Sequence, residues 1–164
     1  MVGAACAALP AAQAVGTFSL SSNATASFSV TITGADLTPT YNEALTVTDT
    51  RTTPTAGWNL TITSTTLTTG APVHTLSTTA SQVNSVAVGT CTGGACVAPV
   101  NAIAFPVAVP AGSTAPTAVK FYDTSAAHGE GVYPITPTIR VAVPGNSFAG
   151  SYSSTLTISL VSGP

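Results

Sequence analysis

Charged side chains are scarce in this chain of 164 residues. Lys, Arg, Asp and Glu together make up 5% of it, against about 25% in an ordinary soluble domain. The three basic and five acidic residues are spread singly along the sequence. Because no basic patch exists, we exclude nucleic acid and anionic membrane surfaces as partners. No run of 18 apolar residues occurs either, so the sequence predicts no membrane span.

Catalytic and metal-binding patterns are scarce too. The chain has two His, no G-x-S-x-G motif, and five carboxylates that all lie near expected turns or strand ends. The densest polar cluster is Asp123, His128 and Glu130, whose spacing matches no metal motif and favours a solvated loop. Nucleophilic catalysis and glycoside hydrolysis both need paired groups that this pattern does not offer. We therefore expect a protein that is not an enzyme, with no metal site and no cofactor.

Only three cysteines are present. Cys91 and Cys96 bracket the four residues from Thr92 to Ala95, a spacing that suits a disulfide closing a hairpin tip. Such a short loop contributes about 2 kcal/mol on the chain-entropy estimate. A disulfide favours an oxidising, extracytoplasmic location. Cys6 is left over, as a free or intermolecular thiol.

Hydroxyl residues take the place of charge, with 30 Thr and 17 Ser in the chain. Thr is β-branched and favours strands over helices. Disorder is excluded because 45% of the residues are hydrophobic and the mean hydropathy is +0.45. Apolar residues alternate with Ser and Thr in several runs. These runs cover residues 27–33, 45–48, 58–63, 139–143 and 152–160.

Gly- and Pro-containing turns divide the chain into about nine or ten short strands. We predict an all-β fold, an antiparallel immunoglobulin-like β-sandwich, as a single domain over residues 17–164. Residues 97–120 are rich in Pro and Ala and predict irregular edge strands or a long crossing connection. The shared alternation phase predicts a buried set of five side chains: Trp58, Leu60, Leu156, Ile158 and Leu160.

The N-terminal segment, residues 1–16, is almost wholly small and apolar. Ala12-Gln13-Ala14 resembles a signal-peptide cleavage site, but no Lys or Arg precedes Arg51 to form the basic region that a signal peptide needs. Two interpretations remain open. The segment is a signal-peptide remnant, or it is a strand donated to a neighbour.

Two further features concern side-chain orientation. Asn23 and Asn59 each begin a glycosylation sequon, and Asn59 is out of phase with Trp58, so we expect it to face outward. Asp49 and Arg51 lie two residues apart and therefore share a strand face. They form either an ion pair that caps the core or a ligand contact.

Two segments resemble the WxL family of Gram-positive cell-surface proteins. Val47-Thr48-Asp49-Thr50-Arg51, a Pro/Gly turn and Gly57-Trp58-Asn59-Leu60 are similar to that family's D-x-R and W-x-L motifs. The run from Tyr152 to Leu160, followed by Pro164, is similar to its closing Y-x-x-x-L-T-W-T-L…P pattern, with Ile158 where the family usually has Trp.

The resemblance implies a non-catalytic, extracellular domain that attaches non-covalently to peptidoglycan or another cell-wall polymer. It also implies that five residues take part in binding this polymer, namely Trp58, Leu60, Asp49, Arg51 and Tyr152. Core packing is the competing explanation for Trp58 and Tyr152, because a sandwich core needs such aromatics.

A structural role is the rival functional class. Few charges mean little repulsion between copies. The chain would then be a subunit of a self-assembling extracellular filament or surface layer, and residues 1–16 would add a strand to the sheet edge of a neighbouring copy.

Overall fold

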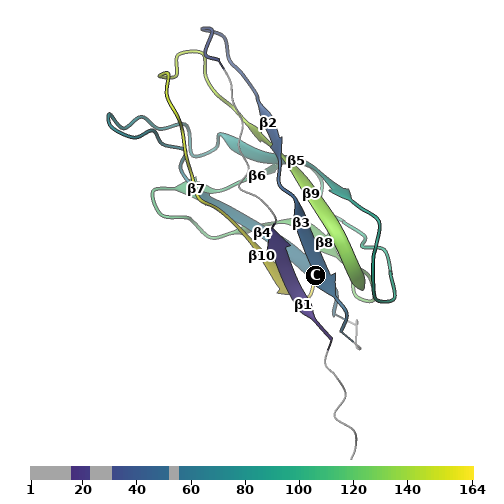
Figure 1. Ribbon diagram of the computed structural model, residues 1–164. Coiled ribbons are helices and arrows are strands. Elements are labelled where there is room, and N and C mark those ends of the chain that lie inside the picture. The colour runs from purple at the N-terminus through teal and green to yellow at the C-terminus, as the bar shows by residue number, and fades with distance from the viewer. Residues whose placement is uncertain (1–15, 23–30, 52–55) are drawn as a thin grey trace, which may run out of the picture.

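The computed structural model describes residues 16–22, 31–51 and 56–164 (Figure 1). Every regular element within these residues is a strand, which confirms the all-β prediction. The predictions for Cys6, for Asn23 and for most of the run at 27–33 lie outside the described residues. The strands are β1 Phe18–Ser22, β2 Thr40–Asn42, β3 Leu45–Asp49, β4 Trp58–Thr65, β5 Ser81–Val88, β6 Val107–Ala108, β7 Ala111–Gly112, β8 Val119–Thr124, β9 Gly131–Val141 and β10 Leu156–Ser162.

The strands form two sheets. The first sheet has the order β1-β3-β9-β5-β6, with β2 also paired to β9, and all its pairings are antiparallel. The second sheet has the order β10-β4-β7, with β8 also paired to β4. Its pairings are antiparallel except for the short parallel contact of β7 with β4. The chain passes from β6 in the first sheet to β7 in the second, so the segment 97–120 is indeed a crossing connection with very short strands.

β9 is the central strand of the first sheet although it contains Pro134 and Pro137. Proline has no N–H to donate, so it fits a sheet only where a ladder ends or is interrupted. Pro137 lies opposite the break between β2 and β3, where its carbonyl accepts from the Glu43 N–H at 3.1 Å. Pro134 lies at the end of the β5 ladder, and its carbonyl accepts from the Gly89 N–H at 2.8 Å.

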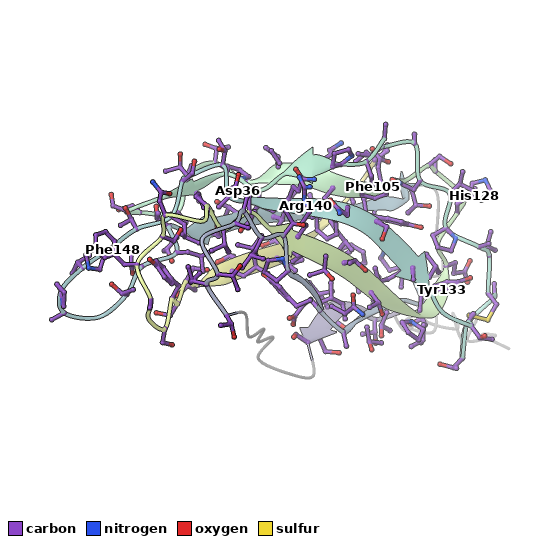
Figure 2. The ribbon with its side chains drawn as sticks, turned by 90° about the horizontal axis from the view of Figure 1, so that it is seen from above. Asp36, Phe105, His128, Tyr133, Arg140 and Phe148 are labelled. Carbon is purple, nitrogen blue, oxygen red and sulfur yellow. A yellow bond between two sulfur atoms is a disulfide. The ribbon has the colours of Figure 1, made fainter. Side chains whose placement is uncertain are left out.

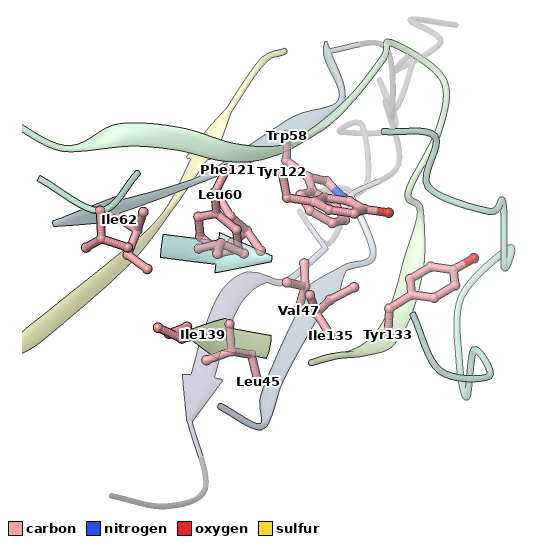
Figure 3. Close-up of a cluster of buried hydrophobic side chains, with 12 residues drawn as sticks. Leu45, Val47, Trp58, Leu60, Ile62, Phe121, Tyr122, Tyr133, Ile135 and Ile139 are labelled. Atoms are coloured by element: carbon pink, nitrogen blue, oxygen red, sulfur yellow. The ribbon is translucent and has the colours of Figure 1, made fainter. Parts of the chain in front are cut away.

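The two sheets enclose one hydrophobic core (Figure 3). Inward-facing side chains of β3 and β9 in the first sheet meet those of β4 and β8 in the second. This follows from strand alternation, because every second residue of each strand points to the same side. The fully or nearly fully buried members include Leu45, Val47, Trp58, Leu60, Ile62, Val83, Phe121, Tyr122, Tyr133, Ile135 and Ile139.

A second, smaller cluster continues the core at the end where β9 finishes. It contains Leu76, Ala80, Val141 and Val143, with partly buried neighbours that include Tyr152. The sequence predicted a strand that begins at Tyr152, but β10 begins four residues later, at Leu156. Tyr152 therefore lies outside β10. Ser153 instead forms an isolated bridge with Thr68, through two backbone hydrogen bonds.

Two burial predictions need correction. Trp58 and Leu60 are buried as predicted, but Leu156, Ile158 and Leu160 are only half-buried. They lie on β10, which has a strand neighbour on one side only within the described residues. Asn59 does not face solvent and is 3% exposed. Its side of β4 is covered by the C-terminal end of the chain, where its Nδ2 donates to the Gly163 carbonyl at 2.6 Å.

Candidate functional site

Four of the five residues with a predicted binding role lie together. Asp49 is the last residue of β3 and Arg51 lies two residues beyond it. The hydrogen bond from Arg51 Nη2 to the Gly57 carbonyl, 3.3 Å long, connects them to the start of β4. Trp58 and Leu60 lie just beyond on β4. Tyr152 is not among them, since it packs on the smaller cluster.

Several contacts within the protein hold the Arg51 side chain, which is 19% exposed. Its Nε and Nη2 each donate to one carboxylate oxygen of Asp49 at 2.8 Å, a bidentate pair. Its Nη1 donates to Ser162 Oγ at 2.7 Å, and its guanidinium lies 3.9 Å from the ring centroid of Phe18. The hydrogen bonds to Asp49 raise the pKa of Arg51. Asp49 itself is 1% exposed, so the structure supports the ion pair that caps the core and leaves the carboxylate no surface for a ligand.

Trp58 also has no exposed surface. Its indole Nε1 donates to the Gly129 carbonyl at 3.0 Å, and its ring stacks on Tyr122 with centroids 5.6 Å apart. Gly129 has φ +78° and a Cβ there would come within 2.4 Å of Trp58 Nε1, so the indole requires glycine at this position. Leu60 is equally inaccessible. Both side chains fill the core (Figure 3), and neither can touch a ligand in this conformation.

The polar cluster from the sequence does not form a metal-binding group. Asp123 lies 3.7 Å from Lys120, and His128 Nδ1 lies 3.2 Å from the Ala98 carbonyl oxygen. Within the described part of the chain, no three His, Cys, Asp or Glu side chains come close enough to hold an ion.

The predicted disulfide is present. Cys91 and Cys96 are joined, with Cα atoms 5.6 Å apart. The loop between them runs beside the start of β9, where the Thr92 N–H donates to the Val132 carbonyl at 3.0 Å. It extends the ladder of β5 and β9 beyond Gly89 and thereby covers this end of the first sheet.

One side of the molecule leaves apolar residues half-covered. Among the described strands, β1 ends the first sheet and β10 ends the second, and the two strands touch without forming a ladder. We call this the open side. It is lined by Phe18, Leu20, Leu156, Ile158 and Leu160, each half-buried and packed against the core.

A second exposed feature lies at one end of the molecule, where the loop 66–76 meets the loop 144–153. We call it the aromatic tip. Phe148 is 60% exposed and Val73 is 69% exposed, while His74 stacks on Phe148 with ring centroids 3.7 Å apart. Figure 2 shows Phe148 at the opposite end from His128 and Tyr133. Sequence reasoning missed the tip, because Phe148 lies in a turn segment outside every alternating run; an aromatic between Gly145 and Gly150 was the only available signal.

The described residues contain no helix long and apolar enough to cross a membrane. No family model, curated protein or solved structure matches this chain. We therefore infer function from two surfaces that the described residues leave uncovered, the open side and the aromatic tip.

Proposed function

We propose that this chain is a non-catalytic structural protein of the bacterial cell surface, secreted and built as an immunoglobulin-like sandwich, whose copies assemble through the open side. The observation that carries the proposal is the half-burial of Leu156, Ile158 and Leu160 on a terminal strand. Their inward orientation marks them as core residues, yet the described chain covers only part of each. A strand from another molecule would complete that cover.

β10 carries none of the features that usually protect a terminal strand from pairing with another chain. Natural proteins place charges, Pro or bulges there. The seven residues Leu156–Ser162 contain no charge and no Pro, and their register with β4 is unbroken. An uncharged, regular strand of this kind is a template for one more strand.

The N-terminal segment is the strand we propose for this place, donated by a second copy. Residues 1–15 carry no charge, and Gln13 is their single polar side chain. Fifteen extended residues reach up to about 50 Å, which is enough to leave one domain and enter the next. The apolar composition matches the half-covered Leu and Ile side chains of β10.

Two variants test this proposal. Deletion of residues 1–16 removes the donated strand, and Ser159→Lys places a charge on the exposed face of β10. Both variants should fold and stay monomeric, whereas the full-length protein should form polymers visible by negative-stain microscopy and sedimentation. Thr48→Lys, on the outer face of the internal strand β3, is the matched control and should leave assembly unchanged. A full-length protein that stays monomeric at high concentration would refute the proposal.

Cell-wall association is the second candidate, and the resemblance to the WxL family suggests it. Arg51 bonds the backbone immediately before Trp58, so the residues that resemble the D-x-R and W-x-L motifs form one connected unit. Because Asp49, Trp58 and Leu60 are buried in that unit, a wall polymer would have to contact other residues of the surface. The variant without residues 1–16 should then still sediment with purified cell walls. A folded monomer that never sediments with them would exclude this candidate.

A further inference from the structure

Phe148 is an apolar ring that the fold leaves exposed. Among the described residues, six large hydrophobic side chains are exposed, and Phe148 is the one aromatic side chain among them. Burying such a side chain is worth about 2 kcal/mol, so a ring kept in solvent needs an explanation. The explanation is independent of assembly through the open side, because the tip belongs to other loops.

The ring is also fixed in place. His74 covers one of its faces, with an interplanar angle of 11°. Tyr152 Oη donates to the Phe148 carbonyl at 3.0 Å. The two loops are joined below the ring by reciprocal backbone hydrogen bonds between Thr68 and Ser153, 3.0 and 2.9 Å long. A rigid ring loses little conformational entropy when it binds a partner.

The surroundings of the ring are uncharged. Neither 66–80 nor 144–155 contains Asp, Glu, Lys or Arg. The nearest carboxylate bound to these loops is Asp36, whose Oδ1 accepts from the Gly145 N–H at 2.8 Å. The same two loops carry hydroxyl side chains instead, and those of Thr75, Ser151 and Ser153 are exposed. The two loops themselves therefore offer no Asp, Glu, Lys or Arg side chain to a charged partner.

We propose that the aromatic tip binds a neutral glycan, with one pyranose ring stacked on the free face of Phe148. A pyranose presents C–H bonds on its face and hydroxyls around its rim. The C–H face matches the exposed phenyl ring, and the rim hydroxyls match the Ser and Thr side chains. The His74 stack holds the phenyl ring in the orientation that the sugar meets.

Binding of two neutral hexasaccharides, chitohexaose and cellohexaose, tests the proposal by calorimetry and saturation-transfer NMR. The Ser159→Lys protein is used, so that failure of assembly through the open side does not affect the result. We expect saturable binding of at least one probe, weakened about tenfold or more by Phe148→Ala, which corresponds to about 1.4 kcal/mol. Phe148→Tyr should retain binding, and His74→Ala should weaken it by a smaller factor. Val100→Ala, at an exposed residue outside the tip, is the matched control and should change nothing.

Absence of binding to both probes would overturn the proposal, as would binding that persists unchanged in Phe148→Ala. Because Phe148 is mostly exposed, that variant should unfold at nearly the same temperature as its parent, which excludes misfolding as the cause of lost binding. If Phe148→Ala instead abolishes a self-association of the Ser159→Lys protein, the tip contacts a second copy and the glycan assignment is wrong.

Discussion

Arg51 shows at the scale of one residue how a sparsely charged protein uses its few charges. Its guanidinium contacts Asp49, Ser162 and the Gly57 carbonyl, and it covers the ring of Phe18. One side chain therefore joins β1, β3, the end of β10 and the residue before β4. Lysine has no planar fork and cannot make the same set of contacts.

Replacement of Arg51 should reveal this role. Arg51→Met leaves the Asp49 carboxylate buried and unpaired, and we expect it to lower the free energy of unfolding by about 3 kcal/mol. Arg51→Lys should be less damaging, because it keeps the charge. Denaturant titration measures both effects, and Asp49→Asn combined with Arg51→Met should recover part of the loss. If Arg51→Met is as stable as the parent, the ion pair does not hold these strands together.

Tyr41 makes stability depend on pH in the alkaline range. Burial, with a smaller effect of Glu43, raises the pKa of Tyr41 to about 12, whereas an unfolded tyrosine titrates near 10. Below pH 10 both states keep the proton, and the contribution to stability is complete. Between pH 10 and 12 the unfolded state loses its proton first, so stability falls as the pH rises, by up to about 2 kcal/mol.

Tyr41→Phe tests this dependence. The variant should lose less stability than the parent between pH 10 and 12 in denaturant titrations at each pH. Some slope should remain, because burial also raises the pKa of Tyr122. Identical slopes in the two proteins would contradict the assignment to Tyr41.

At the scale of strands, β4 and β10 carry similar apolar patterns but have different neighbours. β4 lies between β10 on one side and β7 and β8 on the other, and its inward residues are fully buried. β10 has β4 alone among the described strands. Leu60 of β4 and Leu160 of β10 lie opposite each other in the ladder. The same side chain therefore occurs at matching positions of an internal strand and a terminal strand.

Truncation of these two leucines should separate the two environments. Leu60→Ala opens a cavity in the closed core and should cost about 3–4 kcal/mol of unfolding free energy. Leu160→Ala removes a half-exposed side chain and should cost about half as much in the monomer. Both values come from chemical denaturation of the variant without residues 1–16. Equal losses would show that the open side is closed in solution.

At the scale of the whole molecule, the disulfide stabilises one end, whereas the hydrophobic core stabilises the fold as a whole. The Cys91–Cys96 loop covers the start of β9, while the large buried side chains lie between the sheets. Its short loop limits the entropy that it removes from the unfolded chain.

The double variant Cys91→Ser/Cys96→Ser should therefore stay folded. We expect it to lose about 2 kcal/mol of stability, measured by thermal or denaturant unfolding, with an unchanged far-UV circular dichroism spectrum. Reduction of the parent protein with dithiothreitol should give the same loss. Loss of the β-sheet spectrum in the variant would mean that the disulfide is required for folding.

Local sequence patterns were sufficient to predict the all-β class, the disulfide and the burial of Trp58 and Leu60, and they gave an Asp49–Arg51 ion pair as one of two alternatives. These follow from local rules, because period-two alternation sets the face on which a residue lies and close spacing sets which groups can meet. The alternation near residue 139 predicted only the end of β9, since Pro134 and Pro137 conceal its first half.

Long-range contacts, which no local pattern encodes, set which described strands end a sheet and which side chains of the described residues stay exposed. Leu160 has the alternation phase of a core residue, and Asn59 has the phase of a surface residue, yet the first is half-exposed and the second is buried. Their exposure depends on neighbours far away in the chain, namely the absence of a described strand beyond β10 and the Gly163 carbonyl over β4. The aromatic tip depends likewise on the meeting of two loops about 75 residues apart, because no local pattern encodes a stack between His74 and Phe148.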